Sequence, residues 1–81
     1  MKIPRDVSSD KIVQLLKKYE YKITRQTGSH IRLTSNIKEM EHNITIPKQK
    51  GLRIGTLNNI LSDISRYLEI DKESLIQSLF K

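Results

Sequence analysis

Residues 21–34, with the sequence YKITRQTGSHIRLT, contain the pattern from which the fold can be predicted. Residues 21–26 and 30–34 each alternate apolar or aromatic side chains with polar ones, which is typical of half-buried β-strands. The Thr-Gly-Ser sequence between them has the composition of a tight turn, because Gly28 can adopt a positive φ without steric cost. The stretch therefore predicts a β-hairpin.

The alternation also predicts how the two strands pair. A two-residue loop would put an apolar residue and a polar one on the same face of the hairpin. A three-residue loop over 27–29, with the glycine in the left-handed conformation, places Leu33 opposite Ile23 and keeps the apolar side chains together. In that register His30 lies opposite Gln26 on the outer face.

The flanking residues predict an α+β domain. The helical spacing of apolar residues over 9–19 and 57–68 indicates two helices, and residues 70–80 indicate a third, short one. Residues 42–48, HNITIPK, indicate a third strand that ends near Pro47, because proline donates no hydrogen bond to a sheet. We therefore expect the order α-β-β-β-α plus a C-terminal helix, built on a three-stranded antiparallel sheet.

One core should join these elements. Helices on one face of the sheet would leave its other face open to solvent, and this open face would present His30 and Arg32. With 81 residues and no linker, we expect a single domain over 1–81. The apolar positions expected to pack together are Ile23, Ile31, Leu33, Ile44 and Ile46 of the strands, and Leu15, Leu16, Leu57, Ile60 and Ile64 of the helices.

The charge of the chain favours an anionic partner. Lys and Arg number 15 against 9 Asp and Glu, for a net charge of +6, and the ranges 21–38 and 42–62 contain no acidic residue. The absence of cysteine excludes disulfides, thiolate zinc sites and cysteine nucleophiles. No segment approaches the ~20 apolar residues of a membrane span, so we expect no membrane partner and a cytoplasmic location.

His30 is the first candidate for catalysis. Histidine titrates near neutral pH and can both take and give a proton, so on an open basic face it could act on a phosphodiester and its neighbouring 2′-hydroxyl. A surface histidine without a role is an equally common situation, and position alone leaves both interpretations open. Ser29 is expected to point away from the imidazole and to serve the turn. His42 is expected at a strand end without a role, with no acid patterned beside it, and no metal motif is present.

Lys48, Lys50 and Arg53 are the second candidate group. A solvated basic loop is the ordinary interpretation of any single lysine. Three cations just ahead of a helix could instead bind phosphate, since the helix N-terminus also favours anions.

Several stretches together resemble the HicA (YcfA-like) toxins of prokaryotic toxin–antitoxin pairs. These are MKIPRDVSSDKIVQLLKKYEYKITRQTGSHIRL (1–33), TIPKQK (45–50) and LRIGTLNNIL (52–61). Gly-Ser-His at 28–30, followed by an alternating strand, and the later Ile-Gly-Thr-Leu are the specific parts. One departure is Glu20, where many members have glycine, and it should alter only the end of the first helix.

The resemblance implies a double-stranded-RNA-binding-like fold and an mRNA interferase, a ribonuclease that cuts messenger RNA. It maps the family's catalytic histidine onto His30 and implies a HicB antitoxin that covers the active face. No cofactor is expected. The residues expected to bind the RNA substrate are Gly28, Ser29, Arg32, Lys48, Lys50 and Arg53.

Two other functions remain open from the sequence. The first is a non-catalytic RNA-binding module with the same fold and charges, and the second, weaker one is a basic adaptor for an acidic protein. His30 is the residue that distinguishes the ribonuclease from these alternatives, since a protein that only reads the shape of duplex RNA needs cations but no titrating group.

Overall fold

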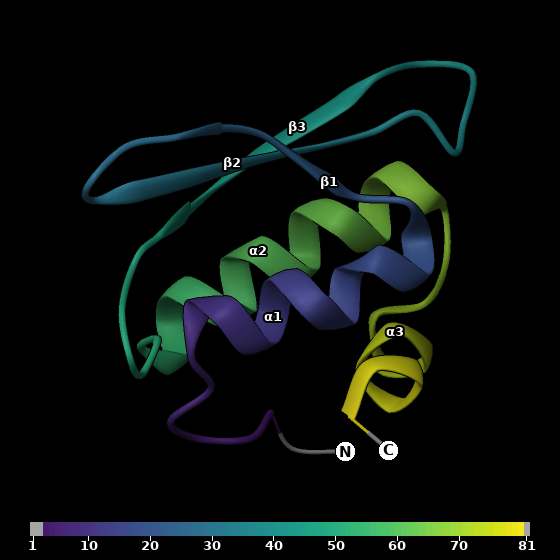
Figure 1. Cartoon of the computed structure of the whole chain (residues 1–81). Helices are drawn as coiled ribbons and strands as arrows, with labels where there is room; N and C mark the ends of the chain where they lie inside the picture. Colours follow the sequence, from purple (N-terminus) through teal and green to yellow (C-terminus); the bar gives the residue numbers. More distant parts are fainter. Residues whose placement is uncertain (1–2, 81) are drawn as a thin grey trace.

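The computed structural model describes residues 3–80 and has the expected α+β order (Figure 1). A short 3₁₀ turn, Lys17–Tyr19, continues the first helix. The elements are α1 (Ser9–Leu16), β1 (Lys22–Gln26), β2 (His30–Ser35), β3 (His42–Pro47), α2 (Ile54–Leu68) and α3 (Lys72–Phe80).

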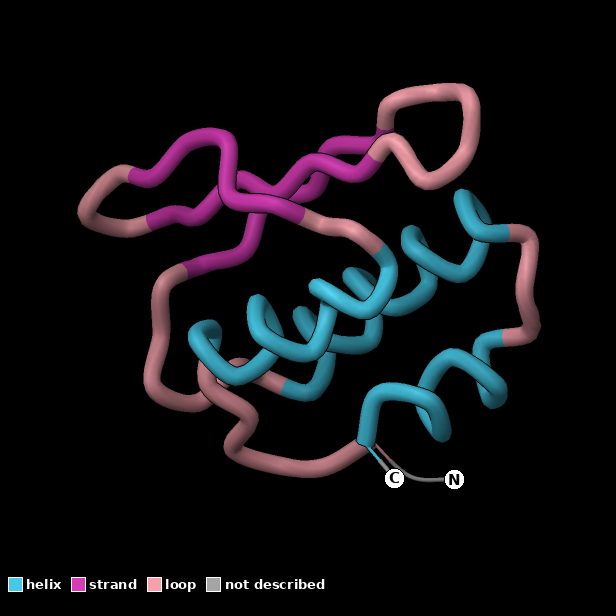
Figure 2. Tube along the Cα trace, turned by 45° about the vertical axis from the view of Figure 1, so that its right-hand side comes forward, coloured by secondary structure: helices cyan, strands magenta, loops and turns pink. Residues whose placement is uncertain are grey.

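The elements form two layers with a third helix behind them. The sheet is antiparallel in the order β1-β2-β3, and α1 and α2 lie side by side along one of its faces (Figures 1 and 2). The α3 helix lies on the side of these two helices that faces away from the sheet (Figure 1). The other face of the sheet is therefore left open, as the sequence predicts. No helix within residues 3–80 combines the length and the apolar character needed to cross a bilayer.

Short-range chemistry fixes the helix ends. The hydroxyl of Ser8 accepts from the N–H of Lys11 at the start of α1, and Asp71 accepts from the N–H of Ser74 at the start of α3. Glu20, where the chain leaves the first helix, has a φ of 64°, in the left-handed region that favours glycine. The α2 helix begins one residue after Arg53, which is its N-cap but makes no side-chain cap bond.

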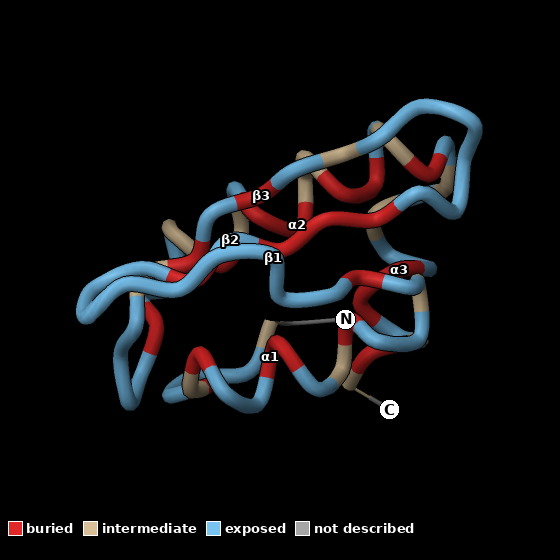
Figure 3. Tube along the Cα trace, turned by 45° about the horizontal axis from the view of Figure 1, so that its top comes forward, coloured by how far each residue is buried: buried red, intermediate tan, exposed pale blue. Residues whose placement is uncertain are grey.

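The core is confirmed at nearly every expected position. Leu15 is half-buried at its edge, while the expected strand residues of β2 and β3 and the helix residues of α2 are buried. Ile23 is the exception: its expected burial is wrong, since 49% of the residue is exposed. Every residue of β1, an edge strand of the sheet, is exposed (Figure 3).

The hairpin register is confirmed in its first half and wrong in its second. Ile23 does lie opposite Leu33, but a β-bulge at Thr24 adds one residue to β1, so that Gln26 lies opposite Ile31. On the β1 side His30 therefore faces Thr27 at the turn and not Gln26, and on its other side it pairs with Pro47 of β3.

The turn is consequently one residue shorter than expected. The N–H of Thr27 donates to the carbonyl oxygen of His30 at 2.9 Å, which leaves Gly28 and Ser29 as the loop. The hydroxyl of Thr27 accepts from the N–H groups of Ser29 and His30, so side-chain bonds hold the turn. Gly28 has no positive φ, and the expected left-handed glycine is wrong.

Candidate active site

The turn that carries His30 is fastened to the end of β3. The carbonyl oxygen of Ser29 accepts a 2.9 Å hydrogen bond from the backbone N–H of Lys48. Pairing of His30 with Pro47 continues this contact into the sheet. The histidine is therefore held between two strands at the rim of the open face, and its side chain is exposed as predicted.

The hydroxyl of Ser29 lies 3.0 Å from Nδ1 of His30. The expectation that Ser29 points away from the imidazole is therefore wrong. The expectation fails because Ser29 belongs to the turn, where side chains do not alternate between two faces as they do along a strand. This contact restricts the imidazole and leaves its Nε2 without a partner among the described residues.

His30 lies in a shallow hollow of about 230 Å³ at the hairpin end of the sheet. Arg32, an expected substrate-binding residue, lines the same hollow. Three other lining residues, Arg25, Thr27 and Thr45, were not predicted from the sequence. Thr45 could have been predicted from the strand pattern, because it lies opposite Arg32 in the β2–β3 pairing. Arg25 could not, because its place in the hollow depends on the bulge in β1.

The basic loop after β3 lies at the same end of the molecule as the hairpin turn, beside the N-termini of α1 and α2 (Figure 1). Reciprocal hydrogen bonds between Ser9 and Gln49 pin this loop to α1. Lys48 and Lys50 line a second hollow there, and Arg53 follows at the start of α2. None of these three cations lines the hollow of His30 in the described part of the chain.

The second histidine belongs to a different cluster at the opposite end of the sheet. Nδ1 of His42 lies 2.6 Å from the hydroxyl of Tyr21, and its Nε2 lies 3.5 Å from a carboxylate oxygen of Asp63. The Tyr67 ring stacks on the imidazole with centroids 4.5 Å apart. The expected position of His42 at a strand end is confirmed, but the fold places Asp63 of α2 beside it, which no acid patterned near it in the sequence indicated.

This cluster ties the sheet to α2. Burial raises the pKa of Tyr21 above its ordinary value of 10.0, and the neighbouring Tyr67 and Asp63 raise it further. A neutral hydroxyl held in this way serves packing, and neither Tyr21 nor His42 lines the hollow that borders Tyr67. Within residues 3–80, no three His, Asp or Glu side chains gather closely enough to hold a metal ion.

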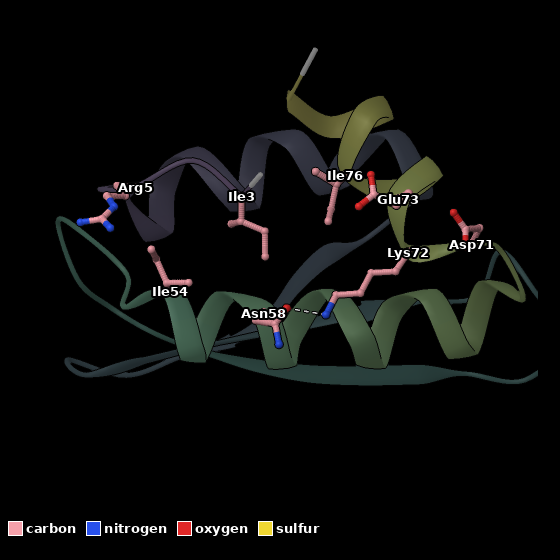
Figure 4. A pocket seen from close by; sticks show the side chains of 8 residues that line it. All are labelled: Ile3, Arg5, Ile54, Asn58, Asp71, Lys72, Glu73 and Ile76. Carbon is pink, nitrogen blue, oxygen red and sulfur yellow. Dashed lines mark hydrogen bonds between the residues drawn. The ribbon is translucent and has the colours of Figure 1, made fainter. Parts of the chain in front are cut away.

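A wider hollow of about 640 Å³ lies between α2, α3 and the N-terminal segment (Figure 4). Ile3, Ile54 and Ile76 give it an apolar lining, and the Lys72 ammonium group donates to the amide oxygen of Asn58 at its side. No histidine lines it. The hollow of His30 is therefore the better candidate for catalysis.

Comparison with known proteins identified one family. The family model described as the HicA toxin of bacterial toxin–antitoxin systems matches residues 9–65, which include β1, β2, β3 and most of α2. A search of curated proteins and a search of solved structures each found no match.

Proposed function

The chain belongs to the HicA family, the toxins of bacterial toxin–antitoxin systems, and from this premise we propose that it is an endoribonuclease whose catalytic residue is His30. It would act as an mRNA interferase and arrest translation. The observation that carries this assignment is the position of His30, which is exposed in a hollow that contains arginine and no acid. A phosphodiester is the substrate group that such a hollow suits.

The imidazole would act as a general base. If Nδ1–H donates to the Ser29 hydroxyl, the free Nε2 can take the proton of a ribose 2′-hydroxyl. The 2′-oxygen then attacks the adjacent phosphorus, the bond from phosphorus to the 5′-oxygen breaks, and a 2′,3′-cyclic phosphate forms. The leaving oxygen takes a proton from water, or from the protonated His30 after it reorients.

The surrounding cations would stabilise the charge that grows on the phosphoryl oxygens. Arg32 lies in the hollow itself, and Lys48 follows the strand end against which the turn is fastened. Lys50, Arg53 and the uncapped start of α2 would hold phosphates further along the RNA. Gly28 and Ser29 would form the wall of the turn beside the substrate.

A toxin of this class acts with a cognate antitoxin, and we propose a HicB-like protein that covers the open face of the sheet. The basic hollow would then be shielded until the antitoxin is removed. Addition of the antitoxin should block both RNA binding and cleavage. Cleavage that continues at full rate in a stable complex would show that the antitoxin binds elsewhere.

The mechanism is tested by an RNA whose scissile nucleotide carries hydrogen in place of the 2′-hydroxyl. This substrate should bind like the unmodified RNA but resist cleavage, and the normal products should carry a cyclic phosphate and a free 5′-hydroxyl. EDTA should leave the rate unchanged, because the proposed steps use no metal. Normal cutting of the 2′-deoxy substrate would contradict the mechanism.

A further inference from the structure

A row of three side chains crosses the open face beside His30. Arg25 of β1 lies opposite Arg32 of β2, and Arg32 lies opposite Thr45 of β3. All three are exposed and line the hollow together with His30. Two guanidinium groups from different strands therefore share one small concave surface.

The bulge in β1 is what brings Arg25 to this surface. Uninterrupted alternation would put Arg25 on the same face as Tyr21, which is buried at 1% exposure. The extra residue, Thr24, shifts the pairing so that Arg25 meets Arg32. The Thr24 hydroxyl lies 2.9 Å from that of Thr34, which holds the bulge in place. Bulges of this kind re-aim side chains next to active sites.

The arrangement is unfavourable for the free protein. Like charges directly opposite each other on neighbouring strands repel. No carboxylate within residues 3–80 forms an ion pair with either arginine. An anion placed between the two guanidinium groups would relieve the repulsion.

Resting on the ribonuclease function proposed above, we infer that Arg25 and Arg32 together bind the non-bridging oxygens of one RNA phosphodiester in this hollow. Guanidinium groups present paired donors that match phosphate oxygens, and lysine lacks this geometry. His30 in the same hollow would face the adjacent ribose. Arg25 is thereby assigned to the substrate site, and the bulge at Thr24 is the device that positions it.

The test compares Arg25→Ala with Lys22→Ala. Both changes remove one positive charge from an exposed position on β1, but Lys22 does not line the hollow. We expect Arg25→Ala to lower kcat/KM for RNA cleavage by about 10²-fold and Lys22→Ala to lower it by about threefold or less. Arg25→Lys should recover only part of the activity. Thermal unfolding should show Arg25→Ala to be as stable as the wild type or more so, because a repulsion has been removed.

Measurements of RNA binding distinguish a failure of this phosphate site from a failure of the proposed ribonuclease function. In a His30→Ala background, a short 2′-O-methyl RNA should bind less tightly after Arg25→Ala, and log Kd should depend less steeply on log salt by about 0.7. If Arg25→Ala binds and cleaves like Lys22→Ala, the phosphate site is wrong, even where His30 still proves to be catalytic. If the wild type cleaves no RNA but binding depends on Arg25, the phosphate site stands without the ribonuclease.

Discussion

The backbone N–H of Lys48 donates a 2.9 Å hydrogen bond to the carbonyl oxygen of Ser29. This bond joins the turn that holds His30 to the first residue of the basic loop after β3. The two groups of residues that the sequence predicts to contact RNA are thus mechanically connected at one end of the sheet. Substitution of the Lys48 side chain leaves this backbone bond intact, so side-chain charge can be tested while the turn is kept.

The basic loop is expected to supply salt-sensitive affinity. Replacement of Lys48, Lys50 and Arg53 with alanine should weaken RNA binding. For each phosphate that is no longer neutralised, the slope of log Kd against log salt should fall by about 0.7. The measurement is a binding titration with single-stranded RNA at several salt concentrations.

A charge-matched control is available at the other end of the molecule. Lys17, Lys38 and Arg66 are exposed, and two of them form surface ion pairs that contribute little to stability. Their replacement with alanine removes the same formal charge, so it should leave the slope close to that of the wild type. Equally weakened binding in the two triple variants would indicate a diffuse charge effect in place of a defined phosphate-binding loop.

The pair Ile23 and Leu33 tests the description of β1 as an exposed edge strand. Leu33 is fully buried, so Leu33→Ala should lower the free energy of unfolding by about 2–5 kcal/mol. Ile23 is half exposed and faces no complete core, so Ile23→Ala should cost about 1 kcal/mol or less. Urea unfolding measures both. Equal costs would mean that β1 packs onto the core as the sequence pattern predicts.

Glu20 offers a stabilising substitution. A residue with a Cβ costs about 1–2 kcal/mol in the left-handed region, and glycine avoids this cost but loses about 0.5–1 kcal/mol in chain entropy. At a φ of 64°, Glu20→Gly should therefore raise the free energy of unfolding by about 0.5–1 kcal/mol. Glu20→Ala removes the same charge but keeps the Cβ, so it should give no such gain. A gain of the same size in the alanine variant would point to charge, not backbone strain, as the cause.

Tyr21 predicts how stability changes at alkaline pH. Burial raises its pKa in the folded protein above the ordinary value of 10.0. As the pH rises past about 10, the unfolded chain loses the tyrosine proton while the folded chain keeps it, so the free energy of unfolding must fall. Tyr21→Phe removes this contribution.

From about pH 9 to about pH 11, the free energy of unfolding should therefore fall more for the wild type than for Tyr21→Phe. Urea unfolding at the two pH values measures it, and the comparison cancels the titration of the other tyrosines and of the lysines. A difference that is the same at both pH values would show that Tyr21 ionises as freely in the folded state as in the unfolded one.

Much of this fold could be predicted because periodicity reports local burial directly. The helical stripes and the pairing of Ile23 with Leu33 depend on neighbours within a few residues or on one alternating pattern. The exposure of His30 depends on the same pattern and was predictable for that reason.

The bulge and its consequences could not be predicted. Thr24 interrupts the strand through hydrogen bonding to Thr34, and threonine is common in regular strands, so composition carries no signal for the irregularity. Its effects reach the turn length, the partner of His30 and the orientation of Arg25. The contact of His42 with Asp63 depends on how α2 packs across the sheet, over a separation that no local pattern encodes.

The proposed function depends above all on His30 as the residue that carries out the chemistry of RNA cleavage. The decisive measurement is single-turnover cleavage of a messenger RNA fragment by the wild type and by His30→Ala, with circular dichroism and RNA binding measured on the same samples. We expect an unchanged fold, retained binding and a rate lowered by at least about 10²-fold, in the range typical for removal of a general acid–base group. Cleavage by a folded His30→Ala protein at the wild-type rate would overturn the assignment.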